Sequence, residues 1–225
     1  MAREIRFELG EECLYDDDVL QSVYPGNLAR SFGYWIHLVP WRKPSNVLML
    51  GYGMGTLSRL LRDTWGPEVR IVGVDRDTLC VKESQDIVIN EDALQFVARQ
   101  ENPGQYDLVI VDLAEGEIPP AFVRSEAFVQ HVARVTSEFV AVNVIGGWGE
   151  EDPFAKVMDL VVTKIIGESK LGNHVYFYRK RYDSAANVQR AEEWERPVDL
   201  VRYDRMIYSS PHQRADQQCA PVRGS

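Results

Sequence analysis

Residues 46–55 read NVLMLGYGMG, an unbroken apolar run followed by three glycines at alternate positions. The apolar run is typical of a central parallel strand that is covered on both faces. Leu57, Leu60 and Leu61 then recur at helical spacing, so the glycines form the turn between a buried strand and an amphipathic helix. Because glycine lets the backbone approach a ligand at a helix N-terminus, the stretch predicts a ligand site at this turn.

Strand and helix patterns alternate along the chain after this unit. Further strands are predicted over 69–74, 87–89, 106–111 and 139–145, and helices around Leu94 and Val97, over 121–135 and over 154–162. This alternation predicts βαβ crossovers and a doubly wound, Rossmann-like α/β sheet that is mostly parallel. The segments 164–169 and 174–180 flank Leu171-Gly172-Asn173 and predict an antiparallel hairpin at the C-terminal edge of the sheet.

The chain before this sheet predicts a small N-terminal β-hairpin. Strand patterns cover 5–9 and 13–23, and the acidic residues 16–18 interrupt the second of them. A helix over 28–39 leads into the main sheet. We therefore expect three parts: the hairpin and turn at 1–30, the Rossmann-like domain at 31–181, and a polar, partly flexible extension at 182–225 with one helix near 188–194.

Composition limits the partners of this chain. Its 225 residues are 45% hydrophobic, which is enough for a full core. Asp and Glu number 34 against 25 Lys and Arg, and the net charge of −9 has the wrong sign for a nucleic-acid-binding surface. No stretch is apolar for long enough to cross a bilayer. We therefore expect a cationic or neutral small-molecule substrate, and neither a nucleic acid nor a membrane as partner.

Cysteine and histidine usage bears on redox compartment and metals. The 3 cysteines are odd in number and far apart, which gives neither a disulfide framework nor a zinc-site spacing. This indicates a reducing, cytoplasmic compartment. The 4 histidines also lack metal-ligand spacing, so we expect no metal site.

Acidic residues follow two further predicted strands. Asp75 closes the strand 69–74, where its carboxylate is placed to accept hydrogen bonds from a ribose diol. Asp92 follows the next strand and opens a helix, a position from which it would contact an adenine amino group. Either acid alone is more often a helix cap or a strand terminator. A dinucleotide fingerprint would require glycine at Thr56, so NAD is disfavoured.

A glycine turn, an acid after the second strand and an acid after the third resemble the S-adenosylmethionine-binding layout of class I methyltransferases. Within that superfamily, residues 14–22 (LYDDDVLQS), Tyr34, 47–51 (VLMLG) and 106–112 (YDLVIVD) are similar to segments of the spermidine synthases, the polyamine aminopropyltransferases. The resemblance covers residues 14 to about 145. It implies S-adenosylmethionine or its decarboxylated form as cofactor, and a homodimer or homotetramer.

The resemblance also implies roles for individual residues. Asp112, at the end of the strand 106–111, matches the catalytic carboxylate, although an Asp at this place also commonly caps a loop. Tyr34 and Glu115 are implied as substrate-binding residues. The implied cofactor-binding residues are Gln21, Gly51, Tyr52, Gly53, Gly55, Asp75, Asp92 and Ala93.

The chain departs from the family at informative positions. Met54 replaces the loop Asp that holds the amine of decarboxylated S-adenosylmethionine, Trp35 replaces a Gln, and Gly73 replaces a ribose-binding Glu. The family's DSSDP signature becomes DLAEG at 112–116. The sequence therefore favours an S-adenosylmethionine-dependent methyltransferase with a small acceptor such as an amine. It leaves two alternatives open: an aminopropyltransferase, and a non-catalytic nucleoside-binding or assembly protein.

Overall fold

The computed structural model describes residues 3–16, 18–24, 27, 29, 33–77, 85–115, 118–167 and 172–181. All of them belong to the unit Met1–Arg181. The polar extension expected at 182–225 and its helix near 188–194 lie outside the described residues.

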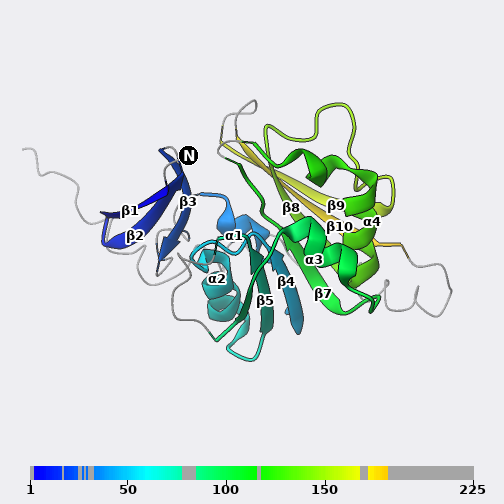
Figure 1. Cartoon of the computed structure of the whole chain (residues 1–225), viewed down its shortest axis with the longest axis horizontal. Helices are drawn as coiled ribbons and strands as arrows, with labels where there is room; N and C mark the ends of the chain where they lie inside the picture. Colours follow the sequence, from blue (N-terminus) through cyan, green and yellow to red (C-terminus); the bar gives the residue numbers. More distant parts are fainter. Residues whose placement is uncertain are drawn as a thin grey trace, which may run out of the picture. The chain divides into compact units, whose positions relative to one another are not determined.

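A seven-stranded sheet forms the centre of the described unit (Figure 1). Its strand order is β6-β5-β4-β7-β8-β10-β9, in which the first five strands run parallel and β10 is antiparallel to both of its neighbours. The predicted doubly wound sheet with an antiparallel edge is therefore confirmed. The strands are β4 (Asn46–Leu50), β5 (Arg70–Asp75), β6 (Ile87–Asn90), β7 (Tyr106–Val111), β8 (Thr136–Ile145), β9 (Met158–Ile166) and β10 (Asn173–Lys180).

Helices connect these strands and pack in pairs, α1 with α2 and α3 with α4. The helices are α1 (Trp35–Leu38), α2 (Thr56–Trp65), α3 (Ala93–Arg99), the 3-10 helix η2 (Ala121–Arg124) and α4 (Glu126–Val135). Ser125 caps α4 by accepting a hydrogen bond from the Phe128 N–H, which divides the predicted helix 121–135 in two. None of the helices in the described ranges is long and apolar enough to cross a membrane.

A three-stranded antiparallel sheet precedes the main sheet, with β1 (Arg3–Glu8), β2 (Glu11–Asp16) and β3 (Val19–Tyr24). The predicted hairpin gains this third strand because the segment 13–23 turns back on itself. Asp18 has a φ of 67°, a left-handed conformation that Asp tolerates better than most residues. The acidic interruption at 16–18 thus marks a second turn rather than an irregular strand.

The predicted helix over 28–39 is shorter in the structure than the sequence suggested, within the part of it that is described. Among the described residues, α-helix covers only Trp35–Leu38. Gly33, with a φ of +88°, breaks the helix just before it. The ring of Trp35 lies 2.7 Å from where a Cβ on Gly33 would stand, so this glycine also makes room for the aromatic side chain.

The predicted helix over 154–162 is wrong, because turns at 153–157 lead directly into β9. The Asp152 carboxylate accepts hydrogen bonds from the N–H groups of Phe154 and Ala155, both at 3.0 Å, and holds the chain in a tight turn. The following residues include Val161, Val162 and other β-branched side chains that favour a strand. The edge hairpin therefore begins earlier than the predicted segment 164–169.

Candidate functional site

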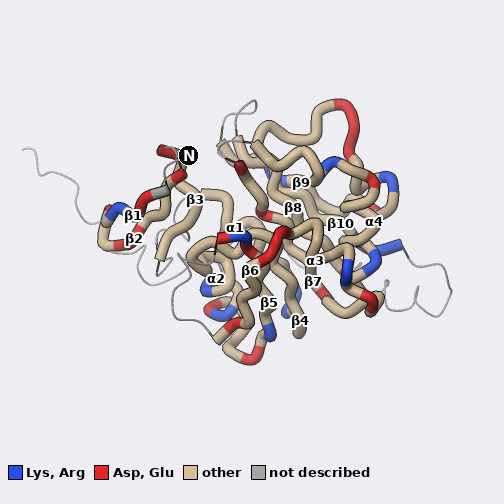
Figure 2. The backbone as a smooth tube through the Cα atoms, viewed as in Figure 1, with Lys and Arg blue, Asp and Glu red and all other residues tan. Residues whose placement is uncertain are grey.

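A cavity lies at the carboxyl ends of β4, β5, β6 and β7, where parallel sheets usually bind ligands. Acidic residues, red in Figure 2, lie at or just after the ends of β5, β6 and β7. The lining brings together most of the residues that the sequence predicted for cofactor, substrate and catalysis. These are Gln21, Tyr34, Gly51, Tyr52, Gly53, Asp75, Asp92, Ala93 and Asp112.

The glycine turn fits closely against the end of β7. Gly51 has a φ of +90°, and a Cβ at this position would lie 2.0 Å from the carbonyl oxygen of Asp112. The Asp112 N–H in turn donates to the carbonyl of Leu50 at 2.8 Å. Only glycine satisfies both the backbone conformation and the contact, and this close approach places Asp112 directly beside the turn.

The backbone N–H groups of the glycine turn all donate hydrogen bonds to acceptors within the protein. Asp75 Oδ2 accepts from Tyr52 and Gly53 at 3.0 and 2.9 Å, and Ser22 Oγ accepts from Met54 at 3.0 Å. The N–H groups of Gly51 and Gly55 donate to backbone carbonyls at 2.9 and 3.1 Å. A phosphate or carboxylate would have to displace these acceptors, so the turn is not a ready anion cradle.

Asp75 therefore shapes the turn as well as lining the cavity. Besides its two bonds to the turn, it accepts a hydrogen bond from the Asp77 N–H through Oδ1 at 3.0 Å. A carboxylate has about four acceptor positions, and three are used here. This leaves room for one ligand hydroxyl rather than for both hydroxyls of a diol.

Asp92 and Ala93 lie where α3 begins. Asp92 is the N-cap of this helix and its side chain accepts from the Gln95 N–H at 3.1 Å. The structural interpretation of this acid is thus correct, while its contact with adenine stays a prediction. Glu91 beside it makes an ion pair with Arg99, and the hydrogen bond from that guanidinium lowers the pKa of Glu91.

Asp112 is held by two neutral donors. The hydroxyl of Tyr34 donates to Oδ2 at 3.2 Å, and the amide of Asn143 donates to Oδ1 at 3.0 Å. Burial raises the pKa of Asp112 from 3.8 to about 6, although both hydrogen bonds favour the charged form. Burial, with the negative charge of Asp112 next to it, also raises the pKa of Tyr34, so this hydroxyl stays protonated. A carboxyl group that titrates near neutral pH suits a proton acceptor.

Asn143 is a site residue that sequence reasoning missed. It belongs to β8 and is 8% exposed. Its Oδ1 atom is buried and has no hydrogen-bond partner among the described residues. The available signal was a single amide side chain within the apolar strand 139–145, because a buried polar group needs a reason to be there.

Three other residues lie outside the described lining of the cavity. Glu115 Oε1 accepts from Arg76 Nη1 at 2.8 Å, so its observed partner is a cation of the cavity wall. Gly55, with a φ of +92°, is the N-cap of α2. The Met54 side chain is 1% exposed and belongs to the core, so it offers the cavity neither charge nor donor.

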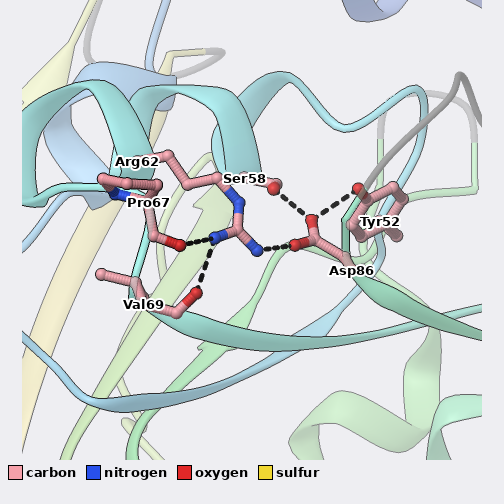
Figure 3. Close-up of polar contacts among 6 residues, drawn as sticks. All are labelled: Tyr52, Ser58, Arg62, Pro67, Val69 and Asp86. Carbon is pink, nitrogen blue, oxygen red and sulfur yellow. Dashed lines mark hydrogen bonds and ion pairs between the residues drawn. The ribbon is translucent and has the colours of Figure 1, made fainter.

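Tyr52 occupies the space that Gly73 leaves open. A Cβ on Gly73 would lie 2.2 Å from the Tyr52 ring, which explains why no side chain stands at this position of β5. The Tyr52 hydroxyl donates to Asp86 Oδ2 at 2.7 Å, and Asp86 also accepts from Ser58 and Arg62 (Figure 3). The Asp86 side chain is 0% exposed, so this network fixes the wall of the cavity from below the surface.

No protein-family model and no curated protein matches this chain. Several solved structures do match this chain in fold. A probable spermidine synthase from Corynebacterium glutamicum superposes with a TM-score of 0.63 at 14% identity, over 83% of this chain and 81% of that one. A spermidine synthase in complex with the transition-state analogue AdoDATO gives 0.55 at 13% identity, over 83% and 74%. A putative O-methyltransferase from Klebsiella pneumoniae gives 0.50 at 11% identity, over 69% and 80%. The chain therefore has the spermidine synthase-like form of the class I methyltransferase fold.

Proposed function

We propose that this chain is a transferase that uses an S-adenosylmethionine-type sulfonium cofactor and that Asp112 accepts a proton from the acceptor substrate. The observation that carries the proposal is the position of Asp112. Its partly buried carboxyl group, with a pKa of about 6, lies in the same cavity as the glycine turn, Asp75 and Asp92. A proton acceptor thus stands beside the place where the fold binds its ligands.

The charges of the cavity favour a cationic or neutral ligand. Asp75, Glu91, Asp92 and Asp112 line it, and its basic side chain Arg76 is paired with Glu115. The N–H groups of the glycine turn already have acceptors, which disfavours a pyrophosphate. An adenosyl sulfonium carries a positive charge and no phosphate. The structural similarity to a spermidine synthase in complex with AdoDATO supports the same class of ligand.

When bound, the sulfonium supplies an electrophilic carbon whose bond to sulfur breaks as the bond to the acceptor forms, leaving a neutral thioether. The protein has to orient the acceptor and remove its proton. Tyr34 and Asn143 hold the two carboxylate oxygens of Asp112, which fixes the direction from which the proton is taken. The proton moves from the acceptor nitrogen or oxygen to Asp112, which later releases it to solvent.

Methyl transfer is the form of the reaction that we favour. The position at which aminopropyltransferases carry an acid in the glycine turn holds Met54, whose side chain is buried in the core. Because Met54 carries no charge, it does not repel the carboxylate of intact S-adenosylmethionine, whereas an acid at this position would. We therefore expect the intact cofactor to bind at least as well as its decarboxylated form. A clear preference for the decarboxylated form would instead favour aminopropyl transfer.

Calorimetric titration of the full chain with S-adenosylmethionine, its decarboxylated form and methylthioadenosine tests the proposal. We expect binding of at least one ligand, and Asp75→Ala should weaken it by about 1 to 3 kcal/mol through the loss of a charged acceptor and of the support for the glycine turn. Asp112→Asn should keep the affinity for methylthioadenosine within a few fold, as should the control Glu101→Gln, an exposed residue outside the cavity. Failure of all three ligands to bind at millimolar concentration would refute the proposal.

A further inference from the structure

The strand order divides the cavity into two ends of different chemistry. Asp75 and Arg76 at the end of β5, with Glu91 and Asp92 just after β6, lie at one end. Asp112 just after β7 lies on the other side of β4 and its glycine turn. The two ends are therefore separated along the edge of the sheet by the width of at least one strand. A ligand with two parts can use both ends at once.

The end beside β7 is built mainly from apolar and aromatic side chains. Leu113 and Ala114 follow Asp112 directly, and Tyr34 and Trp35 lie against each other with their ring centroids 4.9 Å apart. Phe122 of η2 also lines the cavity and is held edge-on against Phe128, with the ring centroids 5.3 Å apart. Such walls bury a flat or bulky apolar group well.

The position of Phe122 is fixed independently of any ligand. Arg124, also in η2, donates to the carbonyls of Gly147 and Trp148 at 3.1 and 2.9 Å, just beyond the carboxyl end of β8. η2 therefore stands over the β7 and β8 side of the sheet. Phe122 therefore reaches the cavity from an element that is anchored beyond β8, the strand next to β7.

Among the described lining residues, Asp112 is the charged group that follows β7, and its hydrogen-bond partners Tyr34 and Asn143 are neutral. The charged residues Glu91 and Arg76 at the other end are paired with Arg99 and Glu115. Since a carboxylate that has lost part of its contact with water is stabilised by a cation close to it, a ligand ammonium group would supply the opposite charge at Asp112. Aromatic rings beside the carboxylate favour a cation as well.

We propose that the acceptor is a monoamine with an aromatic or bulky apolar body, whose single nitrogen contacts Asp112 and whose body packs against Trp35, Leu113 and Phe122. This inference rests on the proposed function, because it assigns the acceptor to the end of the cavity that the cofactor leaves open. The second ammonium group of a linear diamine would lie against Leu113, Ala114 and Phe122, where its desolvation is not compensated.

Calorimetric titration with 2-phenylethylamine and with 1,4-diaminobutane tests the inference, each with and without saturating methylthioadenosine. We expect the aromatic monoamine to bind at least about tenfold more tightly than the diamine. Asp112→Asn should weaken the monoamine by about tenfold or more through the loss of a charged partner. Phe122→Ala should weaken the monoamine and leave the diamine unchanged. The controls Glu101→Gln and Phe7→Ala, both at exposed residues, should change neither amine.

The outcomes separate this inference from the proposed function. The inference is wrong if the diamine binds as tightly as the monoamine. It is also wrong if neither amine binds at 10 mM, about a hundredfold above a typical substrate affinity, with or without methylthioadenosine. In both cases, binding of methylthioadenosine would still support the proposed function. If the monoamine binds and depends on Asp112 and Phe122 but no adenosyl ligand binds, the subsite is real and the cofactor assignment fails.

Discussion

The ionised carboxylate of Asp112 is less stable in the folded protein than in the unfolded chain. This gives a prediction about the free energy of unfolding. Burial raises its folded-state pKa from 3.8 to about 6, so ionisation costs folding free energy. The cost is absent below pH 3.8 and complete above about pH 6. We expect Asp112→Asn to raise the free energy of unfolding at pH 8 by up to about 3 kcal/mol, and to change it little at pH 4.

Urea unfolding of the wild type and of Asp112→Asn at the two pH values measures this difference, with Glu101→Gln as the exposed control. A group that is kept for function at a cost in stability shows this pattern. If Asp112→Asn destabilises the protein equally at both pH values, the carboxylate is a structural loop cap and its catalytic assignment fails.

Asn143 is expected to act on Asp112 as a positioning residue. Its amide donates to the ionised form of the carboxylate, and this hydrogen bond lowers the pKa of Asp112 against the effect of burial. Asn143→Leu removes the donor and should raise the pKa of Asp112 by about 1 unit. Tyr34→Phe should shift it in the same direction. The carboxyl carbon resonance of Asp112 in a pH titration by NMR reports the value, and an unchanged midpoint in Asn143→Leu would show that the contact carries no energy.

At the scale of residues, the sequence predicted the members of this site unevenly. Asp112 and Tyr34 were found because they stand in segments that resemble a family, and the structure places them in contact. Glu115 was selected by the same resemblance; its observed partner is Arg76, and its contact with a substrate stays a prediction. Asn143 was missed because it comes to Asp112 from a different strand through the pairing of β7 with β8, a contact between residues that are far apart in the sequence.

At the scale of elements, the small sheet is fastened to the glycine turn through a few hydrogen bonds. Thr56 Oγ1 donates to the Val23 carbonyl at 2.8 Å, accepts from the Val23 N–H at 2.9 Å and lies 2.7 Å from Ser22 Oγ. Ser22 in turn accepts from the Met54 N–H. β3 therefore supports the turn from the side of α2.

We expect Thr56→Val to lower the free energy of unfolding by about 1 to 3 kcal/mol, because it leaves the buried Val23 groups and Ser22 with fewer partners at nearly unchanged volume. The amide of Val23 should lose protection from hydrogen exchange before the amides of β4 do. Thr163→Val, at an exposed position of β9, is the matched control. Equal effects of the two substitutions would show that β3 is not held by this hydrogen bond.

The sequence predicted elements well where the apolar periodicity agreed with the glycine or proline residues that bound the element. β4, α2 and β7 combine an apolar pattern with flanking glycine or proline, and each appears at the predicted place. The segment 154–162 is a different case, since its apolar residues fit a helix as well as a strand. The Asp152 turn and the pairing with β10 decide it in favour of β9, and both depend on contacts that a local pattern does not contain.

At the scale of the whole molecule, the fold follows from the repeated alternation of strands and helices, which no single wrong element alters. The order of the strands brings residues from 14 to 122 into one cavity, although only the glycine turn and its neighbouring acids mark that cavity in the sequence. The homodimer or homotetramer implied by the resemblance stays a prediction, because it depends on a second copy of the chain.

A crystal structure of the full chain soaked with S-adenosylmethionine tests whether the cavity holds the cofactor beside Asp112. We expect the nucleoside at the end of the cavity formed by Asp75, Asp92 and Ala93, with the sulfur turned toward Asp112. The space beside Trp35 and Phe122 should stay open for the acceptor. Cofactor density elsewhere on the protein, or a bound sulfur that points away from Asp112, would contradict this expectation.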